Sequence, residues 1–174
     1  MIRLSPSGLL HERGWGSGTS EWYTPPALFE ALKLTFDLDP AAPPGGVPWV
    51  PARAHYSTLD DGLAQPWYGR VWCNPPYGPE TGSWLERLAD HGDGLGLVFA
   101  RTDTRWFHAA VPRATAVCFV SGRLRFIPGD GRGSRDTAGA PSLLLAYGLP
   151  CALALAEAGL GQTFLVPTRS APAP

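Results

Sequence analysis

Residues 70–78 read Arg-Val-Trp-Cys-Asn-Pro-Pro-Tyr-Gly, an apolar run followed by a stiff polar turn. The run at 70–73 predicts a compact strand with Asn74 at its carboxyl end. In open α/β sheets, ligands bind beyond the carboxyl ends of the strands. Asn74 is the only asparagine in the chain, so its place in front of Pro-Pro-Tyr calls for a chemical explanation.

The tetrapeptide Asn74-Pro75-Pro76-Tyr77 fits methylation of a planar amine, whose nitrogen lone pair is delocalised into a ring. The Asn74 side-chain oxygen and the Pro75 carbonyl would accept from the two N–H groups and restore the lone pair. The two prolines fix φ and keep both acceptors aimed. Tyr77 offers a flat face to an extruded base, and S-adenosylmethionine would carry the methyl group. The alternative is a plain Pro-Pro turn with Asn74 as a local cap.

Composition favours one globular domain, because the chain has 174 residues and 44% of them are hydrophobic. No apolar run has the length of a membrane span, and the first ten residues lack a signal-peptide pattern. We therefore expect a cytoplasmic protein with no membrane partner. The three cysteines and four histidines show no metal-ligand spacing, so we predict buried free thiols and no bound metal.

Charge is distributed unevenly along the chain. Residues 1–100 carry six basic and eleven acidic side chains, whereas residues 101–174 carry eight basic and four acidic ones. Arginine suits phosphate contacts through its charge and forked donors. A GC-biased coding sequence is the alternative explanation, because the chain has thirteen arginines and one lysine. The candidate nucleic-acid contacts are Arg101, Arg105, Arg123, Arg125, Arg132 and Arg135.

Strand and helix patterns alternate, which favours an α/β layer fold with a mostly parallel sheet. We expect a flexible arm at 1–20, a domain at 21–167 and a disordered tail at 168–174. The first helix is expected to start with Thr24 as N-cap and Pro25 at the first helical position. Further helices are expected at 83–90, 104–111 and 151–158. Strands are expected at 36–39, 55–57, 70–73, 95–100, 114–120, 124–127, 142–147 and 163–166.

Two aspartates would share one end of this sheet with Asn74. Asp39 ends the strand at 36–39 and can meet the ammonium of a nucleoside-methionine cofactor, while Pro40 and Ala41 are small enough for close approach. Asp61 can accept from ribose hydroxyls or from the adenine amine. For each aspartate a cap or turn role is the alternative. The Gly-x-Gly loop of dinucleotide sites is missing.

Several segments resemble, in order, the phage-type DNA N-6-adenine methyltransferases, which are compact enzymes that use S-adenosylmethionine. The resemblance covers about residues 21–147. Its segments are Trp22-Tyr23-Thr24-Pro25-Pro26, Phe36-Asp37-Leu38-Asp39-Pro40-Ala41-Ala42, Asp60-Asp61-Gly62-Leu63 with Trp67, residues 70–78, residues 100–108, Gly122-Arg123-Leu124-Arg125-Phe126 and Pro141-Ser142.

The resemblance implies a single-domain, Rossmann-like S-adenosylmethionine-dependent methyltransferase fold whose sheet ends in a reversed hairpin. It implies methyl transfer to the N6 amine of a flipped adenine in DNA. It also implies that Tyr23, Thr24 and Asn74 lie beside the cofactor. The Pro/Gly-rich stretch at 43–51 departs from the family pattern. Target choice would fall to the loops after Gly78 and at 128–140.

Other functions share some of these features. Cytosine N4, an RNA base or a protein glutamine presents the same planar amine, and the tetrapeptide does not separate them. A DNA-binding module without catalysis, or a structural α/β phage protein, would bind no cofactor. The sequence carries no signal for oligomeric state.

Overall fold

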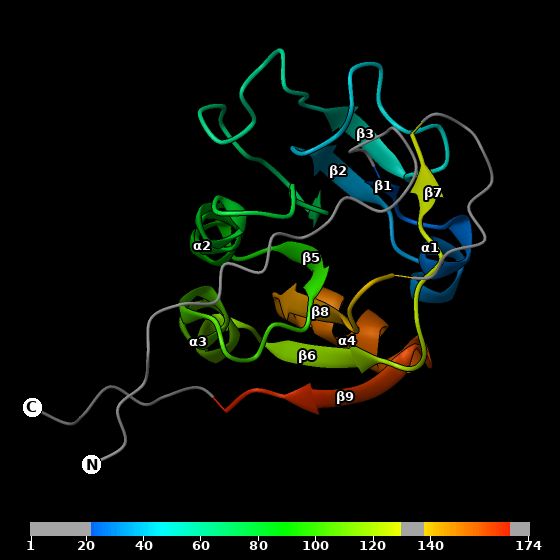
Figure 1. Cartoon of the computed structure of the whole chain (residues 1–174), viewed down its shortest axis with the longest axis vertical. Helices are drawn as coiled ribbons and strands as arrows, with labels where there is room; N and C mark the ends of the chain where they lie inside the picture. Colours follow the sequence, from blue (N-terminus) through cyan, green and yellow to red (C-terminus); the bar gives the residue numbers. More distant parts are fainter. Residues whose placement is uncertain (1–21, 130–137, 168–174) are drawn as a thin grey trace, which may run out of the picture.

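A seven-stranded sheet forms the centre of the molecule (Figure 1). The structure, a computed structural model, describes residues 22–129 and 138–167. Across the sheet the strands follow the order β3-β2-β4-β5-β8-β6-β9, and a separate two-stranded sheet joins β1 to β7. The arm predicted at 1–20, the tail predicted at 168–174, and Arg132 and Arg135 lie outside the described residues.

Strands and helices alternate through most of the chain. The strands are β1 (Trp22–Tyr23), β2 (Phe36–Asp39), β3 (Ala52–His55), β4 (Val71–Cys73), β5 (Gly94–Phe99), β6 (Ala116–Val120), β7 (Ile127–Pro128), β8 (Ser142–Tyr147) and β9 (Gly161–Leu165). The helices are α1 (Pro26–Leu32), α2 (Thr81–His91), α3 (Arg105–Ala110) and α4 (Leu149–Glu157), with a 3-10 helix η1 (Val111–Arg113).

The sheet is mixed, so the α/β class is confirmed but the expectation of a mostly parallel sheet is not. Strands β3, β2, β4 and β5 pair in parallel. Strand β8 lies antiparallel between β5 and β6, and β9 is antiparallel to β6. A buried apolar run reads the same in either direction, so the residues of β8 gave no sign of its orientation.

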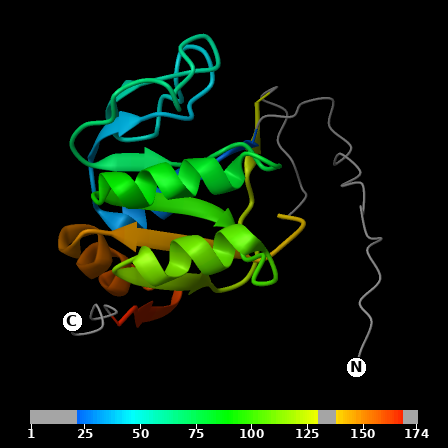
Figure 2. The ribbon, with the colours of Figure 1, turned by 90° about the vertical axis from the view of Figure 1, so that its left-hand side faces the viewer.

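Helices cover both faces of the sheet, with α2 and α3 on one face and α1 and α4 on the other (Figure 2). Successive strand residues point to opposite faces. Val71 and Cys73 therefore enter the core under α2, whereas Trp72 enters the core under α1 and α4. All three are buried, which explains why this strand reads as a continuous apolar run.

Two strands, β2 and β8, have the bounds expected from the sequence. The predicted start of α1 was wrong. Pro25 and not Thr24 is the N-cap, and no side chain makes a capping hydrogen bond there. The residues just before it are extended, since they form β1 and pair with β7. In place of the strand expected at 55–57, the structure has β3 at Ala52–His55. In place of the one expected at 124–127, it has the two-residue strand β7 at Ile127–Pro128. These differences come from pairing between segments far apart in the sequence.

The sheet brings the predicted site residues to one edge. Strands β2 and β4 are parallel neighbours, with Leu38 opposite Val71. Their carboxyl ends carry Asp39 and Asn74, and the neighbouring β5 ends at Phe99. The segments that follow these ends enclose the candidate site, as is usual in open α/β sheets.

Candidate functional site

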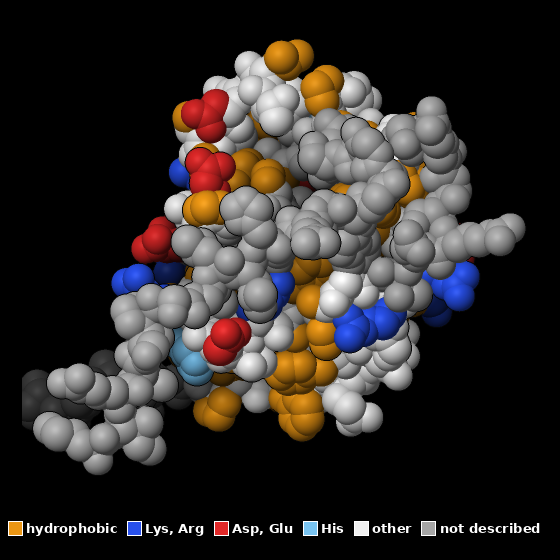
Figure 3. All heavy atoms as spheres, in the orientation of Figure 1, with side chains coloured by type: hydrophobic (Ala, Val, Ile, Leu, Met, Phe, Trp, Pro, Cys, Tyr) orange, Lys and Arg blue, Asp and Glu red, His pale blue; other side chains and the backbone are white. Residues whose placement is uncertain are grey.

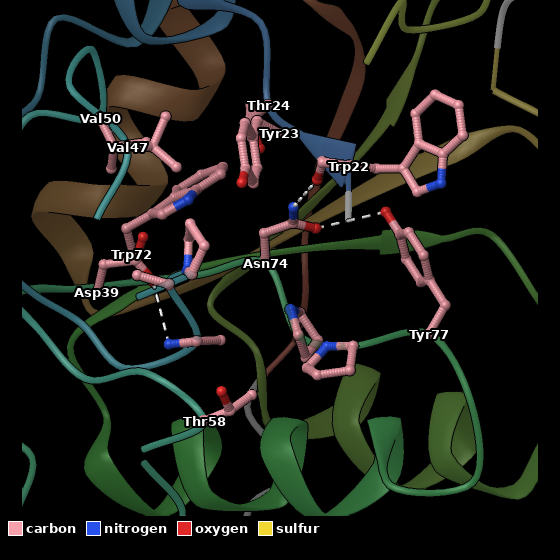
Figure 4. A pocket seen from close by; sticks show the side chains of 15 residues that line it. Trp22, Tyr23, Thr24, Asp39, Val47, Val50, Thr58, Trp72, Asn74 and Tyr77 are labelled. Carbon is pink, nitrogen blue, oxygen red and sulfur yellow. Dashed lines mark hydrogen bonds between the residues drawn. The ribbon is translucent and has the colours of Figure 1, made fainter. Parts of the chain in front are cut away.

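A cavity of about 270 Å³ opens at the carboxyl ends of β2 and β4 (Figure 4). Asp39 lies toward one end, Tyr77 toward the other, and Asn74 between them. Eight of the ten residues predicted for catalysis and cofactor binding line this cavity: Tyr23, Thr24, Asp39, Ala41 and the run at 74–77. Asp39 and Asn74, 35 positions apart in the sequence, are thus brought to one place by the pairing of β2 with β4.

The Asn74 amide is held in a defined orientation. Its Nδ2 donates to the Trp22 carbonyl at 3.3 Å, and its Oδ1 accepts from the Tyr77 hydroxyl at 3.4 Å (Figure 4). A main-chain carbonyl can only accept, so the nitrogen must face Trp22 and the oxygen must point away from it. The bond to Oδ1 is long, and an amide oxygen has two lone pairs, so Asn74 retains acceptor capacity.

The turn after Asn74 is fixed from below by Thr81, the first residue of α2. The Thr81 hydroxyl donates to the Pro76 carbonyl at 3.0 Å and accepts from the Gly78 N–H at 3.1 Å. Thr81 is buried. The Pro76 carbonyl therefore serves to hold the turn, while Pro75, which is buried, forms part of the cavity wall.

Tyr77 is half-buried and enclosed by two aromatic rings. It stacks on Phe99 with centroids 4.1 Å apart and planes 8° apart, and it meets Phe126 edge to face at 6.4 Å. Burial raises the pKa of the Tyr77 hydroxyl, so it stays protonated and donates to Asn74 at neutral pH. Because Phe99 covers one face of the ring, only the opposite face is left for a stacked base.

Asp39 is a buried carboxyl group, only 5% exposed. Burial raises its pKa from the ordinary 3.8 to about 7, and the Ala41 N–H, 3.1 Å from Oδ1, opposes that rise. A cation in the cavity would offset the cost of ionising it. Asp39 also borders an adjoining hollow of about 190 Å³ that reaches His55.

Thr24 contributes an unusual polar group to the cavity. The residue is 2% exposed, and its hydroxyl has no hydrogen-bond partner within the described part of the chain. Buried hydroxyls without a partner are rare in folded proteins, and one that lines a cavity points to a ligand. Thr24 and Asp39 together supply a donor and an acceptor to the same cavity.

Asp61 and Pro40 are not among the residues that line the cavity. Asp61 is exposed and has a φ of 55°. The next residue, Gly62, packs so closely that a Cβ there would lie 2.0 Å from the Pro40 carbonyl oxygen. Trp67 holds this loop by donating its indole N–H to the Gly62 carbonyl at 2.8 Å. The Asp-Gly-Leu…Trp run thus packs against the end of β2, and Asp61 as a cofactor contact stays a prediction.

The four described candidate arginines are exposed but lie on different elements. Arg101 follows β5, Arg105 starts α3, and Arg123 and Arg125 lie between β6 and β7. The Arg123 guanidinium donates to the Ala138 carbonyl at 3.1 Å. In the view of Figure 3 the visible basic side chains form separate groups instead of one patch.

Several site residues carried no usable signal in the sequence. The Trp22 carbonyl orients Asn74 only because β1 pairs with a distant strand. Phe99 and Phe126 meet Tyr77 through tertiary packing. Thr81 could have been found as a hydroxyl placed just after the Pro-Pro turn, at the start of a helix pattern.

The described residues contain neither a cluster of metal ligands nor a membrane-spanning helix. Within residues 22–129 and 138–167, no three His, Cys, Asp or Glu side chains form a group able to hold a metal ion. No helix in that same part is long and apolar enough to cross a membrane. The three cysteines, Cys73, Cys118 and Cys151, are buried free thiols as predicted.

Comparison with known protein families identifies a match to most of this chain. A family model described as DNA N-6-adenine-methyltransferase (Dam) matches residues 17–149, most of the chain. The matched range includes every residue that lines the cavity. No curated protein and no solved structure matches the chain.

Proposed function

Because the chain belongs to the DNA N-6-adenine-methyltransferase family, we propose that it transfers a methyl group from S-adenosylmethionine to the N6 amine of adenine at specific sites in DNA. One observation carries this proposal. The cavity holds the oriented Asn74 amide between the buried Asp39 carboxyl and the Tyr77 ring. A methyl donor at the Asp39 end and a base at the Tyr77 end would meet at Asn74.

The residues at the Asp39 end fit the amino-acid half of the cofactor. Ionised Asp39 would accept from its ammonium group, and the orphaned Thr24 hydroxyl would donate to its carboxylate. Tyr23 and Ala41 would flank this half of the cofactor. Asp61 would reach only a ligand that extends beyond the cavity. The bound cofactor supplies an electrophilic methyl group on its sulfonium.

Asn74 and Pro75 would prepare the amine for attack. The Asn74 Oδ1 and the Pro75 carbonyl accept from the two N–H groups of adenine N6, which draws lone-pair density back to the nitrogen. The same acceptors stabilise the positive charge that develops on N6 as the new bond forms. The Trp22 carbonyl and Thr81 keep this arrangement rigid, so little reorganisation is needed during the reaction.

DNA would reach the site with one adenine turned out of the stack. That base would lie against the face of Tyr77 that Phe99 leaves uncovered. Arg101, Arg105, Arg123 and Arg125, together with Arg132 and Arg135 outside the described residues, would contact phosphates. Such contacts make binding weaken steeply as salt rises.

The test is to incubate the protein with isotope-labelled S-adenosylmethionine and separate samples of DNA, RNA and protein. Digestion to nucleosides and mass detection should find N6-methyladenine in the DNA sample alone. N4-methylcytosine, a methylated RNA base or methylated protein glutamine would identify another planar amine as the substrate. Binding to DNA without binding to the cofactor would instead indicate a module that has lost catalysis.

A further inference from the structure

The Pro/Gly-rich loop at 43–51, which departs from the family pattern, forms a wall of the cavity. Pro43, Val47 and Val50 all line it. The loop is folded by local turns, since Gly46 N–H donates to the Pro43 carbonyl at 2.9 Å and Val50 N–H to the Val47 carbonyl at 3.0 Å. The loop is therefore part of the candidate site and not a surface loop that lies away from it.

Trp49 connects this loop to the segment that carries Thr24. Its indole Nε1–H donates to the Thr24 carbonyl at 2.8 Å, and its ring meets the edge of Tyr23 at 6.3 Å with planes 63° apart. Trp49 is not among the residues that line the cavity. Its contacts join two parts of the cavity wall, the loop at 43–51 and the residues before α1.

The loop needs such a connection because of its own composition. Gly45 and Gly46 have φ values of 87° and 72°, in the region that glycine enters freely and other residues avoid. Glycine also leaves the unbound loop many other conformations. Val47 and Val50 face both the cavity and the adjoining hollow, so displacement of the loop would merge the two spaces beside Asp39.

We propose that Trp49 is a positioning residue for the methyl donor: it anchors the loop at 43–51 so that Val47 and Val50 close the wall of the cofactor cavity. This inference rests on the proposed function, because it takes the ligand of the cavity to be S-adenosylmethionine. The apparent affinity of a site falls in proportion to the fraction of molecules in the binding-competent conformation. Loss of the anchor therefore weakens cofactor binding and shortens its residence time without changing the reacting groups.

The test compares Trp49→Phe with Tyr147→Phe. The first removes the donor to Thr24 and keeps an aromatic ring. The second removes one hydroxyl donor to the Ala110 carbonyl, 3.1 Å away, and also keeps its ring; neither Tyr147 nor Ala110 lines the cavity. The dissociation constant and dissociation rate of S-adenosylmethionine are measured by calorimetry and stopped-flow fluorescence, with melting curves to verify folding.

Trp49→Phe should raise the dissociation constant about threefold to tenfold, in line with the loss of one hydrogen bond. It should speed dissociation similarly and leave kcat at saturating cofactor unchanged. Tyr147→Phe should bind as the original chain does. Trp49→Ala, which also loses the contact with Tyr23, should weaken binding further.

Unchanged binding by Trp49→Phe would overturn the inference, and so would equal weakening by Tyr147→Phe, which would indicate general loosening. A drop in kcat without a change in affinity would equally contradict it. These outcomes are distinct from failure of the proposed function, in which the original chain itself would bind no S-adenosylmethionine.

Discussion

The protonation of Asp39 should control cofactor binding, and Asp39→Asn is the perturbation that reveals it. Burial holds the pKa of Asp39 near 7 instead of 3.8 when the cavity contains no cation. That difference corresponds to about 4 kcal/mol for ionising the carboxyl group inside the folded chain, as an order of magnitude. A bound ammonium group would repay part of this cost and release the proton.

The sign of the stability effect follows from proton counts. Between pH 3.8 and about 7 the unfolded chain has lost the Asp39 proton and the folded, cofactor-free chain keeps it. The Asp39 contribution to the free energy of unfolding therefore falls as pH rises through this range. The side chain introduced by Asp39→Asn cannot ionise, so the free energy of unfolding of the variant should not show this fall with rising pH. The variant should therefore be more stable than the original chain at neutral pH.

Cofactor affinity should change in the opposite direction. Binding requires ionised Asp39, so the dissociation constant should fall by up to about tenfold for each pH unit gained below 7. Above about pH 8 the cofactor's own amino group loses its charge, as α-amino groups do, and affinity should fall again. At pH 7.5, Asp39→Asn should bind about 10-fold to 100-fold more weakly, the cost of losing a hydrogen bond between charged groups.

Isothermal titration of S-adenosylmethionine from pH 5.5 to 9 measures these changes. Repeating it in two buffers with different ionisation enthalpies counts the protons released. We expect close to one proton released per cofactor at pH 6, and none for Asp39→Asn. A dissociation constant that stays flat between pH 5.5 and 7, or an Asp39→Asn variant that keeps the same slope, would refute the reasoning.

Three other substitutions test separate parts of the site. Thr24→Val should weaken cofactor binding about threefold to tenfold. It should not lower thermal stability, because the hydroxyl that it removes has no protein partner among the described residues. Unchanged cofactor affinity in a titration would contradict this prediction. Thr81→Val should release the turn at Pro76, lower the free energy of unfolding by about 1–3 kcal/mol and reduce kcat, while Thr81→Ser should retain most activity in the methylation assay. Gly62→Ala should destabilise the chain by about 1–3 kcal/mol in chemical denaturation, since its methyl group would collide with the Pro40 carbonyl; a variant as stable as the original chain would show that the loop moves freely.

The sequence was informative where local chemistry and local pattern coincide. The apolar run before Asn74 predicted a buried strand, and the Asp39 and Asn74 strand ends were expected to share one sheet edge, as they do. The bounds of β2 followed from its alternating apolar and acidic residues, and those of β8 from its compact apolar run. Each of these strands, with the residue at its end, was predicted from residues close together in the chain.

Features that depend on distant segments were not predictable from local pattern. Residues 22–23 read as the approach to a helix, yet they form β1 because β7 is available for pairing. That pairing also places the Trp22 carbonyl against the Asn74 amide. The cofactor contact assigned to Asp61 stays a prediction, although the local pattern did not show that Gly62 packs closely on Pro40 or that Thr58 lines the cavity while Asp61 does not.

The most direct measurement of the central claim is single-turnover methyl transfer from labelled S-adenosylmethionine to adenine-containing DNA by Asn74→Ala. The account predicts that transfer falls by at least about a hundredfold, the usual cost of losing one preorganised transition-state contact, while cofactor affinity stays within about twofold of the original chain. Methyl transfer by Asn74→Ala at close to the original rate would contradict it, because the oriented amide would then have no part in activating the amine.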